Sequence, residues 1–265
     1  PMIMAVFTKE CNEDLIWNFL DACERFNFLI FAVSHRSSNT QNSNLYRKTR
    51  EYYVGQLDIE TITADIDFLT DGENEDNYCG WFDLDRFKNH IRELFSKNDR
   101  DGFYSWNGLR YFLYEYELFL QDNANIKVVW EDFNKRKKED TIEHIYPQSP
   151  TDSYWKSRFG HLKPTEKRQY LNSLGNLLLL SRSKNAKLQN YDFDKKKRLV
   201  NKDGKEIGYY NGSYSEIAVA KQKEWTPMEI KERGLLMLQF MENRWKFSFD
   251  DWGISKEEIL FPMQN

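Results

Sequence analysis

The stretch "TIEHIYPQSP", residues 141–150, holds one of only four histidines in the 265-residue sequence. His144 comes directly after Glu143 and three positions before Pro147, inside an apolar, β-branched run. β-Branched residues favour extended backbone, so residues 141–146 are predicted to form a short strand. A histidine in such a strand is either a packed core residue or the base of an active site.

A second stretch, "LGNLLLLSRSKNAKLQN" at residues 174–190, extends the pattern. The apolar run after Gly175 predicts a buried strand, and "SKNAKLQN" predicts a short helix with Ser183 as its N-cap. Between the two stretches lies a loop followed by a helix with Pro164 near its first turn. The predicted order is therefore strand, long loop with a helix, strand, helix.

The rest of the chain is predicted to be mostly helical. Residues 1–125 show apolar spacings of three and four, which predict a helical domain. The β-branched run "NIKVVWEDF" at 125–133 predicts a further extended segment. We therefore expect an α+β fold, mostly α, with a helical domain or linker region at 1–125 and a second domain at 126–265. The core of that second domain is expected at about 140–198, and its last helix at about 226–248.

Composition narrows the class of protein. Aromatic residues make up 16% of the chain, which excludes a disordered protein. The formal net charge is −4, so nucleic acid would have to bind at a local patch. Three cysteines without CxxC spacing fit a reducing cytoplasm, and no apolar run is long enough for a membrane span. The opening Pro1, without the layout of a signal peptide, favours a fragment of a longer protein.

The two motifs together suit metal-dependent cleavage of a phosphodiester bond. Such a reaction needs a base that deprotonates water, which a neutral histidine provides near pH 7. It also needs a hard cation held by oxygen ligands, which a carboxylate and an amide oxygen provide. Residues 184–205 carry eight Lys and Arg against three Asp, and this local charge suits phosphate contacts.

The ordered motifs resemble an HNH (ββα-metal) nuclease, and in particular the C-terminal domain of GmrSD-type restriction and phage-defence nicking endonucleases. The specific resemblance covers residues 140–198 and extends weakly to the last helix. It implies a ββα-metal nuclease unit with flanking helices, which binds a single Mg²⁺ or Mn²⁺ ion and nicks or cleaves DNA in bacterial antiviral defence. It also implies an upstream ParB-like sensing domain in the same polypeptide, and a location in the bacterial cytoplasm.

The resemblance assigns a role to each motif residue. His144 would be the general base, Asn185 a metal ligand, and Asn176 the residue that orders the loop and His144. Glu143 takes the place of an acid that ligates metal in related nucleases. Neighbouring side chains on a regular strand face opposite ways, so Glu143 and His144 share a site only if the strand bulges or ends there. The lysines expected to contact DNA are Lys184, Lys187, Lys195 and Lys196.

Two other functions remain open at this level. The same residues could cleave RNA, or bacterial DNA as a toxin does. Alternatively, the aromatic helical domain could be a docking module and the ββα unit a non-catalytic nucleic-acid binder. The presence of His144, Asn176 and Asn185 together favours an enzyme.

Overall fold

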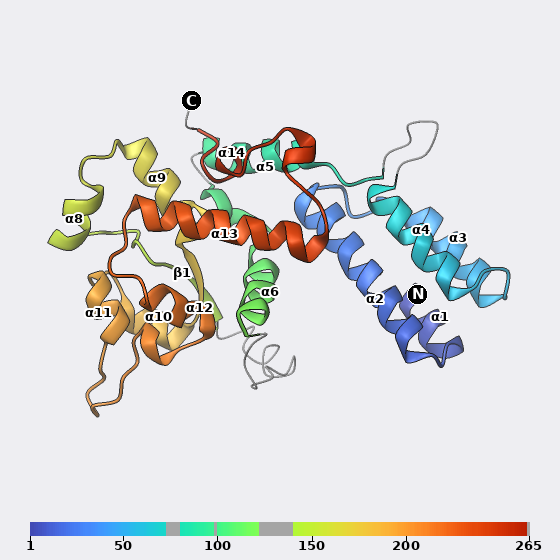
Figure 1. Ribbon diagram of the computed structural model, residues 1–265, viewed down its shortest axis with the longest axis horizontal. Helices are drawn as coiled ribbons and strands as arrows, with labels where there is room; N and C mark the ends of the chain where they lie inside the picture. The colour runs from blue at the N-terminus through green and yellow to red at the C-terminus, as the bar shows by residue number, and fades with distance from the viewer. Residues whose placement is uncertain (73–79, 98–99, 122–139, 264–265) are drawn as a thin grey trace. The chain divides into compact units, whose positions relative to one another are not determined.

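The chain folds into two compact units, Pro1–His90 and Ile91–Asn265. We use a computed structural model that describes residues 1–72, 80–97, 100–121 and 140–263 (Figure 1). The predicted domain boundary at 125–126 and the predicted extended segment at 125–133 lie outside the described residues.

The N-terminal unit is helical over its described residues. Its second helix begins where the Asn12 side chain accepts hydrogen bonds from the backbone N–H groups of Asp14 and Leu15, as an N-cap does. The elements are α1 (Met2–Lys9), α2 (Glu13–Asn27), the π-helical η1 (Phe28–Val33), α3 (Asn42–Tyr53), α4 (Ile59–Asp71) and α5 (Leu84–Ser96), which ends in the other unit.

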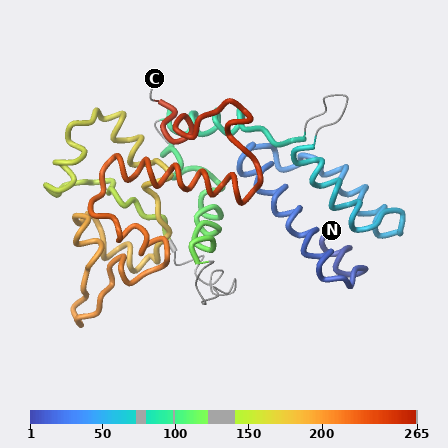
Figure 2. Tube along the Cα trace, in the orientation of Figure 1, coloured from blue at the N-terminus to red at the C-terminus, as the bar shows by residue number. Residues whose placement is uncertain are grey.

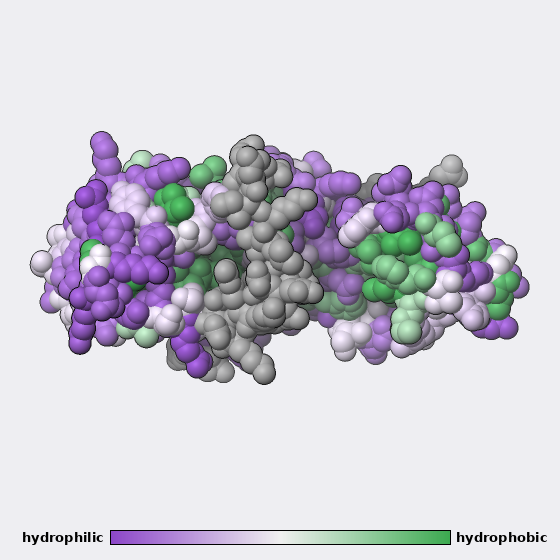
Figure 3. All heavy atoms as spheres, turned by 90° about the horizontal axis from the view of Figure 1, so that it is seen from below, coloured by the Kyte–Doolittle hydropathy of each residue, from purple (hydrophilic) through white to green (hydrophobic). Residues whose placement is uncertain are grey.

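Apolar side chains gather on one face of the N-terminal unit (Figure 3). Ile3, Met4 and Phe7 of α1 are among the exposed apolar residues, with exposed fractions of 47%, 75% and 57%.

The C-terminal unit surrounds a small sheet with helices. Its elements are η2 (Gly102–Ser105), α6 (Leu109–Gln121), β1 (Asp140–His144), α8 (Ser153–Phe159), α9 (Pro164–Asn172), η3 (Leu174–Asn176), β2 (Leu177–Ser181), α10 (Arg182–Leu188), α11 (Phe193–Arg198), η4 (Tyr209–Asn211), α12 (Tyr214–Ala220), α13 (Pro227–Trp245), η5 (Asp250–Trp252) and α14 (Lys256–Leu260). This content confirms the predicted α+β, mostly α fold. Among the described residues, none of the helices has the length and apolarity needed to cross a lipid bilayer.

The two strands, each predicted from its sequence stretch, pair antiparallel. Glu143 lies opposite Leu178, and His144 lies opposite Leu177. Helix α10 follows β2 without a loop, so the order strand, strand, helix matches the prediction. Its cap is Ser181 and not the predicted Ser183, because the side-chain oxygen of Ser181 accepts from the backbone N–H of Lys184.

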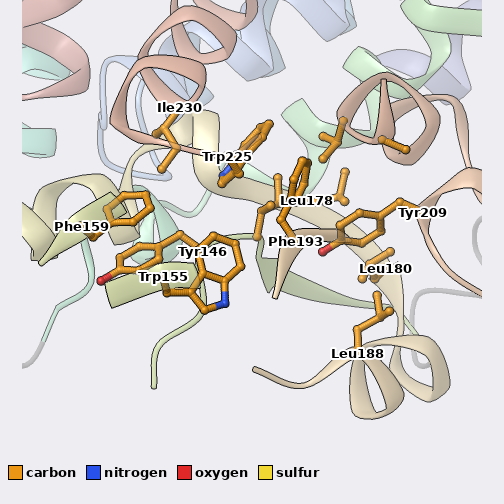
Figure 4. Close-up of a cluster of buried hydrophobic side chains, with 13 residues drawn as sticks. Tyr146, Trp155, Phe159, Leu178, Leu180, Leu188, Phe193, Tyr209, Trp225 and Ile230 are labelled. Atoms are coloured by element: carbon orange, nitrogen blue, oxygen red, sulfur yellow. The ribbon is translucent and has the colours of Figure 1, made fainter. Parts of the chain in front are cut away.

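An aromatic core holds the sheet against the helices. Leu178 and Leu180 of β2 point into a buried cluster that contains Trp155 of α8 and Phe193 of α11 (Figure 4). Large buried rings of this kind contribute most of the packing energy of a small core. The cluster fixes the positions of β2, α8 and α11 relative to one another.

Helix α13 is the longest element of the unit and runs beside α9 and α14 (Figure 2). Thr226 and Glu229 form its capping box, and this start agrees with the predicted one at residue 226. The helix packs closely on η3: a Cβ atom on Gly175 would lie 1.9 Å from the backbone oxygen of Ile230. Only glycine permits this approach, which sets η3 and the start of β2 against α13.

Candidate functional site

His144, the last residue of β1, is buried and held by residues distant in sequence. Its Nε2 lies 3.2 Å from Oδ1 of Asn172, at the end of α9. The ring of Tyr104, from η2, lies with its centroid 4.8 Å from that of the imidazole. An amide oxygen can only accept a hydrogen bond, so Nε2 carries the hydrogen and Nδ1 keeps a free lone pair.

The surroundings of His144 keep its imidazole neutral. Burial lowers the pKa of His144 to about 4, although the hydrogen bond with Asn172 and the charge of Asp101 act in the opposite direction. Burial disfavours the charged form of a histidine because the low-dielectric interior solvates the imidazolium poorly. The unprotonated Nδ1 that a general base needs is therefore present at neutral pH.

One pocket of about 310 Å³ brings the predicted residues together. Its lining is mostly polar and comes from η2, β1, the loop after β1, and α10 with the residues that follow it. The lining residues are Tyr104, Thr141, Ile142, Glu143, His144, Pro147, Gln148, Asn185, Gln189 and Asn190. The structure thus places the proposed base, His144, and both proposed metal ligands, Glu143 and Asn185, around the same space.

Asn185 is oriented by the strand that carries His144. Its Nδ2 donates a hydrogen bond of 2.8 Å to the hydroxyl oxygen of Thr141 on β1. With the amide nitrogen held in this way, Oδ1 is the atom of Asn185 left to accept a hydrogen bond or to bind a cation. Gln189, at the end of the same helix, has a positive φ of 45°, a strained backbone for a residue other than glycine.

Glu143 lines the pocket and also takes part in a buried ion pair. Its Oε1 lies 2.5 Å from Nζ of Lys196, and both side chains are buried. Burial raises the pKa of Glu143, while the positive charge of Lys196 acts in the opposite direction and favours the carboxylate. A buried carboxylate beside a buried ammonium satisfies the charge of both groups.

Asn176 orders the loop after His144 but makes no hydrogen bond with His144 among the contacts of the described residues. Its Oδ1 accepts from the backbone N–H of Tyr146 at 2.8 Å, and its Nδ2 donates to the Tyr146 oxygen at 3.0 Å. It also binds the Leu171 oxygen and Nε1 of Trp225. The predicted contact with the imidazole belongs instead to Asn172, which the sequence interpretation missed.

The four lysines expected to contact DNA have different surroundings. Lys187 is exposed, and Lys195 is exposed with its Nζ 3.5 Å from the ring centroid of Tyr191. Lys184 forms an ion pair with the buried Glu216 and donates to the Asn211 oxygen. Lys196 requires a correction: it is 0% exposed, so it cannot contact a phosphate at the surface.

In comparisons with known proteins, the chain matches one protein family. A family model described as "GmrSD restriction endonucleases, C-terminal domain" matches residues 84–240, more than half of the chain. The match includes both strands, α10 and most of α13, and it begins upstream of η2, whose Tyr104 lines the pocket. No curated protein matches the chain.

Proposed function

The chain belongs to the family of GmrSD restriction endonuclease C-terminal domains, and from this premise we propose that it is a metal-dependent DNA endonuclease of the HNH type. One observation carries the proposal: a neutral, buried His144 lines the same pocket as Glu143 and Asn185. The resulting strand, strand, helix unit would be the ββα-metal core that the sequence predicts.

In this proposal His144 is the general base. Its Nδ1 accepts the proton of a water molecule as that water attacks phosphorus, while Nε2–H stays bonded to Asn172. Asn172 fixes the ring and its tautomer, and Tyr104 packs against one side of the ring. Proton transfer to a positioned side chain typically contributes about 10²–10⁴-fold to a rate.

The donor set fits a hard divalent cation, and we propose a single Mg²⁺ or Mn²⁺ ion held by Asn185 and Glu143. Carboxylate and amide oxygens are ligands that such cations prefer, and Mg²⁺ usually keeps water and substrate phosphate oxygens as further ligands. Among the described residues, there is no group of three or more His, Cys, Asp and Glu side chains that could enclose a metal. A bound cation would offset negative charge on the phosphate and on the leaving oxygen.

The proposed substrate is DNA, contacted through surface cations next to the pocket. Lys187 and Lys195 are exposed and close in sequence to the pocket residues Asn185 and Gln189. Phosphate contacts by such lysines position a duplex without selecting its sequence. The role in antiviral restriction, the upstream ParB-like sensing domain and the bacterial cytoplasm are further parts of this proposal, and they rest on the family alone.

Nicking of supercoiled plasmid with Mg²⁺ or Mn²⁺ tests the proposal. Wild type is compared with His144→Ala and with His161→Ala, a matched control because His161 is exposed and does not line the pocket. We expect His144→Ala to lose about 10²–10⁴-fold in kcat and His161→Ala to keep wild-type activity. Equal activity in wild type and His144→Ala would contradict the proposal, and structured RNA in the same assay tests the RNase alternative.

A further inference from the structure

Lys196 of α11 is a buried lysine with all three of its donors bound. Its Nζ donates to Oε1 of Glu143 at 2.5 Å, to the His144 oxygen at 3.2 Å and to the Ile145 oxygen at 3.1 Å. A lysine ammonium has three N–H donors, so these bonds satisfy it completely. Burial of a charge without such partners is costly, so the fold retains Lys196 inside only because these bonds form.

The two carbonyl bonds mark a change in the backbone after β1. In a regular strand, successive carbonyl groups point to opposite sides, as do successive side chains. One ammonium that binds the oxygens of both His144 and Ile145 therefore lies where the backbone leaves the extended conformation. The strand ends at His144, at this position. Lys196 therefore holds the backbone where the residue His144 leaves the sheet.

We propose that Lys196 is a positioning residue, which fixes the backbone at the end of β1 and with it the position of His144. The inference rests on the proposed nuclease function, because it names what holds the proposed base of that site in place. Lys196 touches neither the pocket nor the surface, so it acts through the residues that it binds.

Lys197 provides a matched control in the same helix. It is also buried, at 4% exposed, and its Nζ donates to the backbone oxygens of Gln222 and Lys223 at 3.1 and 3.4 Å. It forms an ion pair with Asp194 as well. Within the described part of the chain, these contacts hold α11 to residues 222–223 and include none to β1. Loss of either lysine removes one buried ammonium, but only Lys196 binds the strand that carries His144.

The first test compares Lys196→Met with Lys197→Met in plasmid nicking with Mn²⁺. Displacement of a catalytic group by about 1 Å can cost about 100-fold in rate, so kcat of Lys196→Met is expected to fall about 100-fold. KM for the plasmid is expected to stay at the wild-type value, because Lys196 does not reach the surface where DNA binds. Lys197→Met is expected to keep the wild-type kcat. An equal fall of kcat in the two variants would overturn the proposal, as would a change confined to KM.

The second test does not need activity. With four histidines in the chain, the side-chain NMR resonances of labelled histidine can be assigned one by one. We expect the His144 ring resonances to move in Lys196→Met and to stay in place in Lys197→Met. Unchanged His144 resonances in folded Lys196→Met would overturn the proposal. If wild type neither binds Mn²⁺ nor nicks DNA, the proposed nuclease function fails, and these resonances still decide the role of Lys196.

A third variant applies if Lys196→Met does not fold. Lys196→Arg keeps the positive charge but replaces three tetrahedral donors with a planar fork of five. If Lys196 sets the geometry of the strand end, the His144 resonances move and kcat falls in this variant too. Wild-type resonances and wild-type kcat in Lys196→Arg would show that charge alone suffices, and would overturn the positioning role.

Discussion

Oδ1 of Asn172 lies 3.2 Å from Nε2 of His144, although the two residues are 28 positions apart in the chain. Asn172 ends α9 and His144 ends β1, so the contact depends on how the helix packs beside the sheet. In such a pair the amide oxygen selects the tautomer of the histidine and holds the plane of its ring. The candidate base is therefore oriented by a residue outside the two motifs that identify the family.

Removal of this amide should slow catalysis without weakening substrate binding. In Asn172→Ala the ring of His144 loses its orientation, and kcat for nicking is expected to fall about 10–100-fold with KM unchanged. Asn243→Ala is the control, because Asn243 is an exposed asparagine in α13 whose side-chain oxygen accepts only from Gln239 among the described contacts. Steady-state kinetics that show wild-type kcat in Asn172→Ala would contradict the assigned role.

The nicking rate should persist at acid pH. Burial lowers the pKa of His144 to about 4. A histidine with an ordinary pKa of about 6.5 is largely protonated at pH 5, whereas His144 would still be neutral there. We expect kcat to stay level down to about pH 5 and to fall below it. A midpoint near 6.5 in the wild-type profile would contradict a buried, neutral base.

The same shift should make stability depend on pH. His144 has a pKa of about 4 in the folded state. An unfolded histidine has a pKa of about 6.5, so between these values the unfolded chain binds more protons. The free energy of unfolding therefore falls as pH decreases through this window, by about 3 kcal/mol in all. Urea unfolding at pH 7 and pH 4.5 should show a loss that is about 2–3 kcal/mol smaller in His144→Gln than in wild type. Equal losses in the two proteins would contradict the prediction.

The exposed lysines should determine how DNA binding responds to salt. Each phosphate contact releases counterions, so Lys187→Ala and Lys195→Ala should each reduce the slope of log Kd against log salt by about 1. Lys163, an exposed lysine at the start of α9, is the control position. Binding of an uncleaved duplex at several salt concentrations measures the slope. Unchanged slopes in both variants would place the DNA interface elsewhere.

The sequence predicts the strands and α10 because short-range patterns determine them. The β-branched run before His144 and the apolar run after Gly175 indicate strands by themselves. Asn185 lies in α10, which begins directly after β2 ends, so this helix starts beside the sheet. Asn172 and Tyr104 give no comparable signal, because they reach His144 only through the packing of α9 and η2 in the folded chain.

Lys196 shows how a run of charges can mislead. In "FDKKKR" the lysines predict a solvated face, and Lys195 is indeed exposed. However, residues three and four positions after Phe193 lie on the same face of a helix as that ring. Phe193 is fully buried, so Lys196 and Lys197 turn inward with it. Helical spacing from the one aromatic residue of α11 could have identified both buried lysines.

Anomalous diffraction from crystals of the wild-type chain grown with Mn²⁺ tests the central claim most directly. The claim is that Asn185, Glu143 and His144 converge on one cation-binding pocket. We predict a single anomalous peak in that pocket, in contact with Oδ1 of Asn185, which disappears in Asn185→Ala. Two results would contradict the account. One is the lack of an anomalous peak in the pocket both in crystals of the protein alone and in crystals of its complex with DNA. The other is a peak that persists unchanged in Asn185→Ala.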